Sequence, residues 1–221
     1  MDLILIFLII VLPLIAQAKV RSSYNKYSNI KSNGKLTGKD VARMILDSNG
    51  LNNVTIEKIG GSLTDHYNPK TKSISLSESI YDDNSISSIS VAAHECGHAI
   101  QDKESYSFFN LRSTLVPIVN ITSKLSSIFV MLGFFLEIIN LLEIGIFLLC
   151  GGLLFQLVTL PVEFDASNRA KAQLQQLGLI SDNELTGVKK VLGAAALTYV
   201  AGFLAEALQI LRLVLLTRRR D

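Results

Sequence analysis

The chain has 221 residues, of which 49% are hydrophobic and 18% charged, and its formal net charge at neutral pH is only +2. This length allows one domain, or a small domain with membrane spans, and the mean hydropathy of +0.38 favours the second. The small net charge gives no reason to expect a nucleic-acid partner. The two cysteines, Cys96 and Cys150, are too few for a disulfide framework.

The N-terminal segment 3–18 is almost wholly apolar. A secretory signal carries its basic residues before the apolar run, whereas here Lys and Arg follow it, over 19–31. The run Ala-Gln-Ala at 16–18 faintly resembles a cleavage site, so a signal peptide is the alternative. We expect a retained transmembrane helix over 1–20 with its basic flank in the cytoplasm.

The next segment, 21–115, is more polar and predicts a small mixed domain. Thr37, with Asp40 three residues later, is typical of a capped helix start and predicts a short helix over 37–48. A cluster of Asp, Asn and Ser at 82–85 has N-cap chemistry and predicts a longer helix over 85–102. An apolar stripe of Ile and Ala runs along that second helix.

Short apolar runs between these two helices predict a small sheet. The segment 73–77 alternates Ser with Ile and Leu, which is typical of a strand with one exposed face. Turn signals at 60–61 and 68–71 separate it from the earlier runs. We expect strands at 54–56, 63–67 and 73–77.

The strongly apolar segment 116–160 predicts a transmembrane helical hairpin. Its two helices, 125–139 and 144–160, are expected on either side of the more polar stretch 140–143. After Pro161 the chain becomes polar, and a separate helix is expected within 161–193.

The final segment, 194–221, contains an apolar run and a basic tail. Glu206 and Arg212 interrupt the apolar run, and Arg218 to Arg220 follow it. If the run 194–216 crosses the membrane completely, the tail lies outside, against the positive-inside rule. A re-entrant or in-plane helix is therefore an alternative, and Glu206 favours burial against protein over exposure to lipid.

The segment from His94 to His98 has the pattern His-Glu-x-x-His on the predicted helix 85–102. Because residues four apart share one helix face, both imidazoles can bind one Zn²⁺. Glu95 then lies beside the metal, where it can take a proton from the attacking water and pass it to the leaving amine. Small neighbours such as Gly97 allow close backbone approach, and two incidental histidines on a solvated face are the alternative.

A catalytic zinc needs a third protein ligand and an open position. Glu163 is the best acidic candidate, because the predicted hairpin returns the chain to the membrane side that carries His98. Its structural alternative is an acid that stabilises the first turn of a helix after Pro161. The remaining histidine, His66, lies upstream of the motif.

At this point three segments resemble the bacterial neutral zinc metallopeptidases of the YugP type and, more distantly, membrane gluzincins such as the CAAX-prenyl endopeptidases and the heat-shock membrane proteases. The resemblance covers essentially the whole chain. The segments that carry it are Thr64 to Pro69, His94 to His98 and Leu160 to Ser167.

The resemblance implies that Glu163 is the third zinc ligand. Ser167 occupies the position of a later Asp that contacts a zinc-bound histidine in the relatives. The candidates for contacts with the zinc-bound histidines are therefore Ser167 itself, Asp165 and Asn168. His66 is a candidate donor to the oxyanion, with a surface or capping histidine as the alternative.

The resemblance also suggests that an edge strand pairs with the extended substrate. The predicted strand at 73–77 is the candidate, and an ordinary edge strand is the alternative. The residues expected to contact substrate are Ser73, Ile74, Ser75 and Leu76.

These observations together predict an α+β, mainly helical, multi-span and membrane-embedded zincin-like metallopeptidase with a small edge sheet and one Zn²⁺. The expected substrate is a membrane-associated protein or peptide, reached from the cytoplasmic side of the cell membrane. An inactive scaffold or chaperone with a structural metal is the alternative, and a transporter with Glu206 in its pathway is another.

Overall fold

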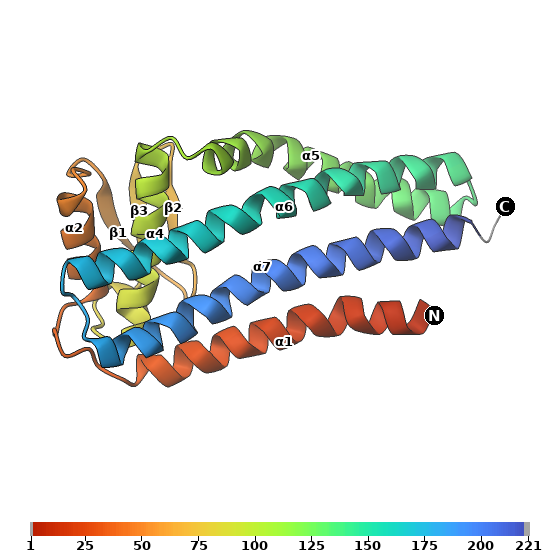
Figure 1. The fold of residues 1–221 in the computed structure, drawn as a ribbon. Helices are drawn as coiled ribbons and strands as arrows, with labels where there is room; N and C mark the ends of the chain where they lie inside the picture. Colours follow the sequence, from red (N-terminus) through yellow and green to blue (C-terminus); the bar gives the residue numbers. More distant parts are fainter. Residues whose placement is uncertain (1, 219–221) are drawn as a thin grey trace. The chain divides into compact units, whose positions relative to one another are not determined.

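The computed structural model describes residues 2–218, which form two compact units. We call residues 2–17, 110–161 and 197–218 the apolar unit, and residues 18–109 and 162–196 the mixed unit. The predicted fold class is confirmed, because the chain is mainly helical with one small sheet (Figure 1). The elements in chain order are α1 (Asp2–Ser28), α2 (Gly38–Ser48), β1 (Thr55–Ile59), β2 (His66–Asn68), β3 (Ser73–Ser77), α3 (Glu78–Tyr81), α4 (Ile86–Lys103), α5 (Ser107–Phe135), α6 (Ile139–Gln176) and α7 (Asp182–Thr217).

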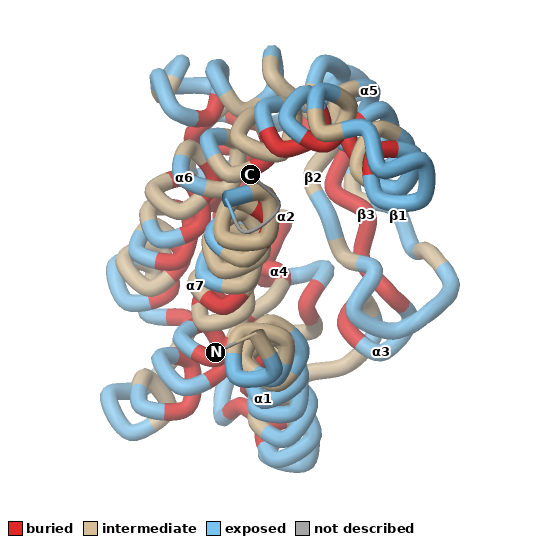
Figure 2. Tube along the Cα trace, turned by 90° about the vertical axis from the view of Figure 1, so that its right-hand side faces the viewer, coloured by how far each residue is buried: buried red, intermediate tan, exposed pale blue. Residues whose placement is uncertain are grey.

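The sheet of the mixed unit has the order β1-β3-β2, with β3 parallel to β1 and antiparallel to β2. All five residues of β3 are buried (Figure 2), so the prediction of a half-exposed edge strand is wrong. Two of the three serines of this strand, Ser73 and Ser77, are hydrogen-bonded through their hydroxyls. The Ser77 hydroxyl donates to Asp65, and the Ser73 hydroxyl pairs with that of Thr71 at 2.8 Å.

The core of the mixed unit lies between α2, α4 and the sheet, and segments from α6 and α7 contribute to it. The predicted capping box of α2 is confirmed, because the Thr37 hydroxyl and the Asp40 carboxylate cap each other's backbone N–H. Typical fully buried side chains of this core are Val41, Ile45, Leu76, Ile89, Ala93 and Leu174.

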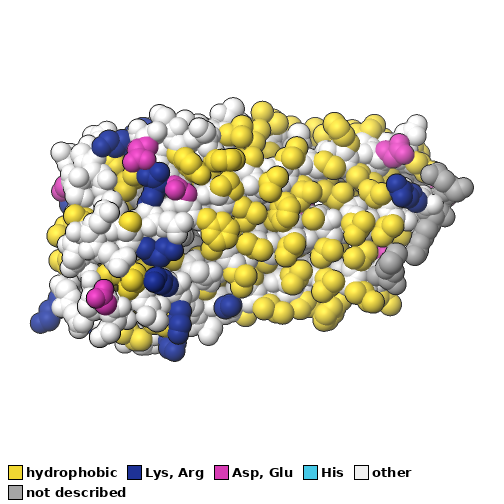
Figure 3. Space-filling model, viewed as in Figure 1, with side chains coloured by type: hydrophobic (Ala, Val, Ile, Leu, Met, Phe, Trp, Pro, Cys, Tyr) yellow, Lys and Arg dark blue, Asp and Glu magenta, His cyan; other side chains and the backbone are white. Residues whose placement is uncertain are grey.

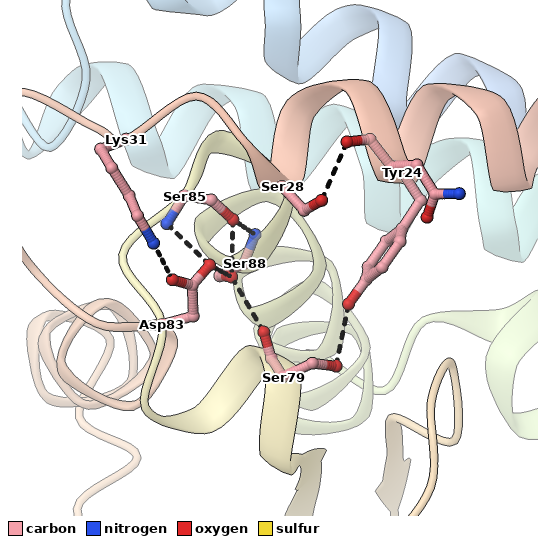
Figure 4. A network of polar contacts seen from close by, with 8 residues as sticks. Tyr24, Ser28, Lys31, Ser79, Asp83, Ser85 and Ser88 are labelled. Carbon is pink, nitrogen blue, oxygen red and sulfur yellow. Dashed lines mark hydrogen bonds and ion pairs between the residues drawn. The ribbon is translucent and has the colours of Figure 1, made fainter.

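A network of polar contacts, in which Ser85 and Ser88 are buried, starts helix α4 (Figure 4). Ser85 is the N-cap, and its hydroxyl accepts from the Ser88 backbone N–H. The Asp83 carboxylate accepts from the Ser88 hydroxyl at 2.8 Å and pairs with Lys31. Burial raises the pKa of Asp83, but the bonds from Lys31, Ser85 and Ser88 outweigh it and hold the pKa at about 2. The first turn of the helix that carries the histidines is therefore fixed.

The apolar unit has the character of a membrane domain. Among the described residues, four helices are long and apolar enough to cross a membrane: α1, α5, α6 and α7. Large apolar side chains are exposed on them, such as Phe7 at 61%, Phe135 at 77% and Phe147 at 77%. Figure 3 shows hydrophobic side chains spread across the face of this unit that is turned to the viewer. Such a surface suits lipid and not water.

The hairpin of the apolar unit turns at 136–138, between α5 and α6, whereas the sequence predicted a turn at 140–143. Two glycines let the helices approach closely. A Cβ on Gly133 would lie 2.6 Å from the Leu142 nitrogen, and one on Gly145 would lie 2.8 Å from the Val130 nitrogen. The Ser126 hydroxyl also donates to the Gly145 carbonyl at 3.0 Å. The polar residues at both ends of 140–143 predicted a loop, but this stretch belongs to the start of α6.

Helices α6 and α7 continue through the positions where the sequence predicted new segments. Pro161 lies inside α6. A proline removes one backbone hydrogen bond from a helix, and membrane helices tolerate this loss. Helix α7 likewise passes through 193–194 without a break. Glu206 is half-buried, and its carboxyl lies against Gly152 of α6, as expected for burial against protein. Arg219 and Arg220 of the predicted basic tail lie outside the described residues.

Candidate metal centre

Three side chains of the mixed unit converge on one point. His94 and His98 extend from α4, and Glu163 extends from α6. One ligand atom from each lies within 4.8 Å of the others. The Glu163 Oε2 atom is 3.2 Å from His94 Nε2 and 3.6 Å from His98 Nε2. The sequence had predicted these three residues as ligands, and the structure brings them together.

The close packing of α4 on α6 explains the convergence. A Cβ on Gly97 would lie 2.5 Å from the Ala166 carbonyl oxygen, so only glycine permits this approach. Glu163 is three residues before Ala166 and therefore shares its helix face. Because Gly97 lies between the two histidines, the same contact directs Glu163 to both imidazoles.

Glu95 is buried beside the three ligand residues. Burial raises the pKa of its carboxyl to about 7; His94 opposes that rise, while the negative charges of Glu163 and Asp65 add to it. A backbone hydrogen bond from Tyr67 lowers the pKa again. A carboxyl whose pKa lies near neutrality can both take up and release a proton, as a general base and acid must.

Both histidines have a partner at Nδ1, the ring nitrogen away from Glu163. The Ser167 hydroxyl lies 3.2 Å from His94 Nδ1, so the structure places this candidate beside a ligand histidine. The side-chain oxygen of Gln101 lies 3.0 Å from His98 Nδ1. Asp165 reaches His98 only through Gln101, whose amide nitrogen donates to it at 2.8 Å. Asn168 is exposed and is hydrogen-bonded to neither histidine.

His66 does not have the orientation expected of an oxyanion donor. It lies exposed on β2, and its Nδ1 is 2.9 Å from the Thr64 carbonyl oxygen. A carbonyl only accepts, so in the neutral ring Nδ1 carries the proton and Nε2 is an acceptor. The neutral imidazole therefore cannot supply the donor predicted from the sequence.

The prediction that Ser73, Ile74, Ser75 and Leu76 pair with substrate is wrong for a physical reason. These residues belong to β3, whose two edges are already paired with β1 and β2. In the order β1-β3-β2, the outer strand that lies next to the three ligand residues is β2, and its outer edge pairs with no other strand of the described residues. That edge faces Glu95, because the Tyr67 backbone N–H bonds to the Glu95 carboxylate.

The residues present fit a zinc ion. Two imidazole nitrogens and one carboxylate are a typical set for a catalytic zinc, which keeps a further position open. Cys96 does not complete the set, because it is fully buried and its thiol lies 3.6 Å from the Ala42 carbonyl. Burial also raises the pKa of this thiol well above its usual range, which disfavours the thiolate that binds metal. Among residues 2–218, the group of side chains that could hold a metal consists of His94, His98 and Glu163.

Sequence reasoning missed three residues around the site: Gln101, Asp65 and Tyr67. Gln101 follows His98 by three residues, so the helical period could have placed it beside that histidine. Asp65 and Tyr67 lie in the segment Thr64 to Pro69 that carries the family resemblance, but their contacts with the site depend on where the chain near β2 lies and follow from no helical spacing.

Comparison with known proteins agrees with this geometry. Residues 2–218 match the model of the family described as "Putative neutral zinc metallopeptidase". The chain is also 47% identical over 201 residues to the "Putative membrane protease YugP" of Bacillus subtilis (strain 168), covering 91% of this chain and 89% of that protein. No solved structure matches the chain. The chain thus belongs to the "Putative neutral zinc metallopeptidase" family.

Proposed function

We propose that the protein is a membrane-embedded zinc endopeptidase of the gluzincin type, with His94, His98 and Glu163 as ligands of one Zn²⁺. The observation that carries the proposal is the convergence of these side chains within 4.8 Å, next to a buried carboxyl. The family match supports the zinc and the peptidase class.

Bound zinc supplies a positive charge that polarises the scissile carbonyl and acidifies water. Glu95 takes the proton of the attacking water and delivers it to the leaving nitrogen. The pKa of about 7 supports this role, because such a carboxyl changes its protonation state with little free-energy cost near neutral pH. Ser167 and Gln101 hold the two imidazole rings in place through Nδ1.

The substrate backbone is proposed to pair with the outer edge of β2, where the Tyr67 N–H now bonds to Glu95, in place of the β3 residues predicted from the sequence. An extended chain added to β2 as a strand would pass beside Glu95. Main-chain pairing of this kind requires a locally unfolded or flexible substrate segment. We therefore expect unstructured regions of membrane-associated proteins or peptides to be cleaved.

We also propose that the protein is a multi-pass protein of the cell membrane with its site in the cytoplasm. Four spans would leave residues 18–109 and 162–196, which together form the mixed unit, on the same side. The basic residues that follow the first span, such as Lys19, Arg21 and Lys26, favour the cytoplasmic side.

The test uses the full chain purified in detergent. Zinc content and cleavage of unfolded casein are measured for the wild type, for Glu95→Gln, and for Glu57→Gln as a matched control at an exposed position of β1. We expect Glu95→Gln to keep its zinc and to lose about 10²–10⁴-fold in cleavage rate, whereas Glu57→Gln behaves as wild type.

Equal cleavage by Glu95→Gln would remove the proposed general base. A wild-type protein that binds zinc and cleaves nothing would instead favour the catalytically inactive scaffold or chaperone. Loss of zinc in the Glu95→Gln variant would show that this residue is a ligand and not a base.

A further inference from the structure

Gln101 is a fully buried amide between the two helices of the site. Its nitrogen lies 2.8 Å from the Val162 carbonyl oxygen and 2.8 Å from Asp165 Oδ2. Both of these oxygens accept hydrogen bonds, and a side-chain amide has two N–H groups to donate. The orientation of the amide is therefore forced by its partners, with the nitrogen toward α6 and the oxygen toward His98.

The forced orientation of Gln101 decides where His98 carries its proton. The amide oxygen, an acceptor only, lies 3.0 Å from His98 Nδ1, so Nδ1 must be the donor. The lone pair of the neutral ring is then on Nε2, the nitrogen that lies 3.6 Å from Glu163 Oε2. We infer that Gln101 is a positioning residue that fixes the His98 tautomer needed to bind zinc before the metal arrives. This inference rests on the proposed zinc site.

His94 is held differently, because its partner is a hydroxyl. Ser167, 3.2 Å from His94 Nδ1, can donate or accept. In the metal-free protein His94 Nε2, which lies 3.2 Å from Glu163 Oε2, can keep its proton and donate it to the carboxylate. With a metal held at Nε2, the single proton of the neutral ring would have to be on Nδ1, where it could be donated to Ser167. The tautomer of His98 is therefore fixed by its partner, whereas the tautomer of His94 can change.

The same amide also places the third ligand. Val162 and Asp165, the two acceptors of the Gln101 nitrogen, flank Glu163 in the sequence of α6. Asp165 is itself fixed by Arg169 at 2.6 Å, and Arg169 reaches Glu104 at 2.7 Å, just beyond the end of α4. Gln101 is therefore the central member of a chain that ties His98 and Glu163 to one geometry, as partners of metal-binding histidines commonly do.

The test reads the tautomers directly by nitrogen NMR of the full chain in detergent micelles, labelled with ¹⁵N at histidine only. The chain has 3 histidines, so His66→Gln and His94→Gln variants assign the signals. The metal-free protein is measured at a pH about two units above roughly 6.5, the pKa of a free histidine side chain. We expect His98 to carry its proton on Nδ1 in the wild type, and a wild-type His98 protonated on Nε2 would overturn the inference without any variant.

Two variants of the partner residues complete the test. Gln101→Met keeps the side-chain length and removes the amide. We expect it to shift the His98 signals toward the Nε2–H form and to weaken zinc binding about 10–100-fold. Ser167→Ala should leave the His98 signals unchanged and weaken zinc binding less. Unchanged His98 signals in folded Gln101→Met would also overturn the inference.

The experiment separates this inference from the proposed function. The tautomer is read in metal-free protein, so it is measurable even if the wild type cleaves nothing. If the wild type binds zinc and cleaves casein while His98 carries its proton on Nε2, the inference fails and the proposed function stands.

Discussion

Leu174 and Leu154 lie on the same helix, α6, in opposite surroundings. Leu174 belongs to the mixed unit and is fully buried in its core, whereas Leu154 belongs to the apolar unit and is 61% exposed. The mixed unit encloses its apolar side chains as a water-soluble domain does. The apolar unit presents them outward, which is favourable only where the solvent is lipid.

The difference shows what holds each unit together. In the mixed unit, removal of apolar surface from water drives the packing, and buried polar groups are paired. In the apolar unit, helices gain little from burying one apolar side chain more, so close contacts at glycines and hydrogen bonds such as Ser126 to Gly145 contribute relatively more. The same substitution should therefore have different effects in the two units.

The largest difference is expected for the matched changes Leu174→Ala and Leu154→Ala. Leu174→Ala leaves a cavity in the core and should destabilise the mixed unit by about 2–5 kcal/mol. Leu154→Ala removes a lipid-facing side chain and should cost well under about 1 kcal/mol, within the range of surface substitutions. Thermal unfolding of both variants in the same detergent measures this, and equal losses would contradict the division into two kinds of packing.

A second comparison uses one glycine from each unit. Gly97→Ala places a Cβ against the Ala166 backbone, so α4 and α6 must separate, at a cost of about 1–3 kcal/mol and with weaker zinc binding. Gly152→Ala meets only the Glu206 carboxyl, the flexible end of a side chain, which can move aside. We expect Gly152→Ala to change the unfolding temperature less and to leave zinc affinity unchanged. Zinc affinity lowered equally in both variants would rule out a specific role for the Gly97 contact.

A smaller effect, visible as a pH dependence, is expected from the buried carboxyl of Glu95. In the metal-free protein burial raises its pKa from 4.5 to about 7, so the folded state holds the proton more tightly than the unfolded state. The stability contributed by this group is therefore lost as the pH rises from about 4.5 to about 7. Glu95→Gln, which resembles the protonated form, should match the wild type in acid and be more stable above neutrality.

The measurement for this third prediction is the unfolding temperature of both proteins with excess chelator across that pH range. A constant difference between them at every pH would show that Glu95 does not titrate there. The wild type and Glu95→Gln differ only at one residue of the mixed unit, so a difference between their unfolding temperatures reports on that unit.

Local sequence patterns predicted the parts of the site that depend on one helix. The spacing of His94 and His98 requires only the helical period, and the Thr37 and Ser85 caps require only neighbouring residues. Glu163 was predicted because the expected count of spans placed it on the same side as His98, and the structure brings the two residues together. These features need no knowledge of tertiary packing.

The predictions from sequence failed where contacts between distant segments determine the local structure. The Ser-Ile-Ser-Leu-Ser pattern of β3 resembles a half-exposed strand, but all five residues are buried, and Thr71 and Asp65 pair with Ser73 and Ser77. Pro161 was taken as a helix start, although α6 continues through it. The role of Gln101 depends on acceptors of α6, a helix distant in sequence, and no local pattern reveals it.

The most direct test of the central claim compares two glutamates, one from each unit. Zinc bound per chain is measured by elemental analysis and titration for the wild type, Glu163→Ala and Glu206→Ala, all as full chains in detergent. We expect one zinc in the wild type and in Glu206→Ala, and a large loss of zinc affinity in Glu163→Ala, because a ligand oxygen is removed. Wild-type zinc affinity in folded Glu163→Ala would contradict the account.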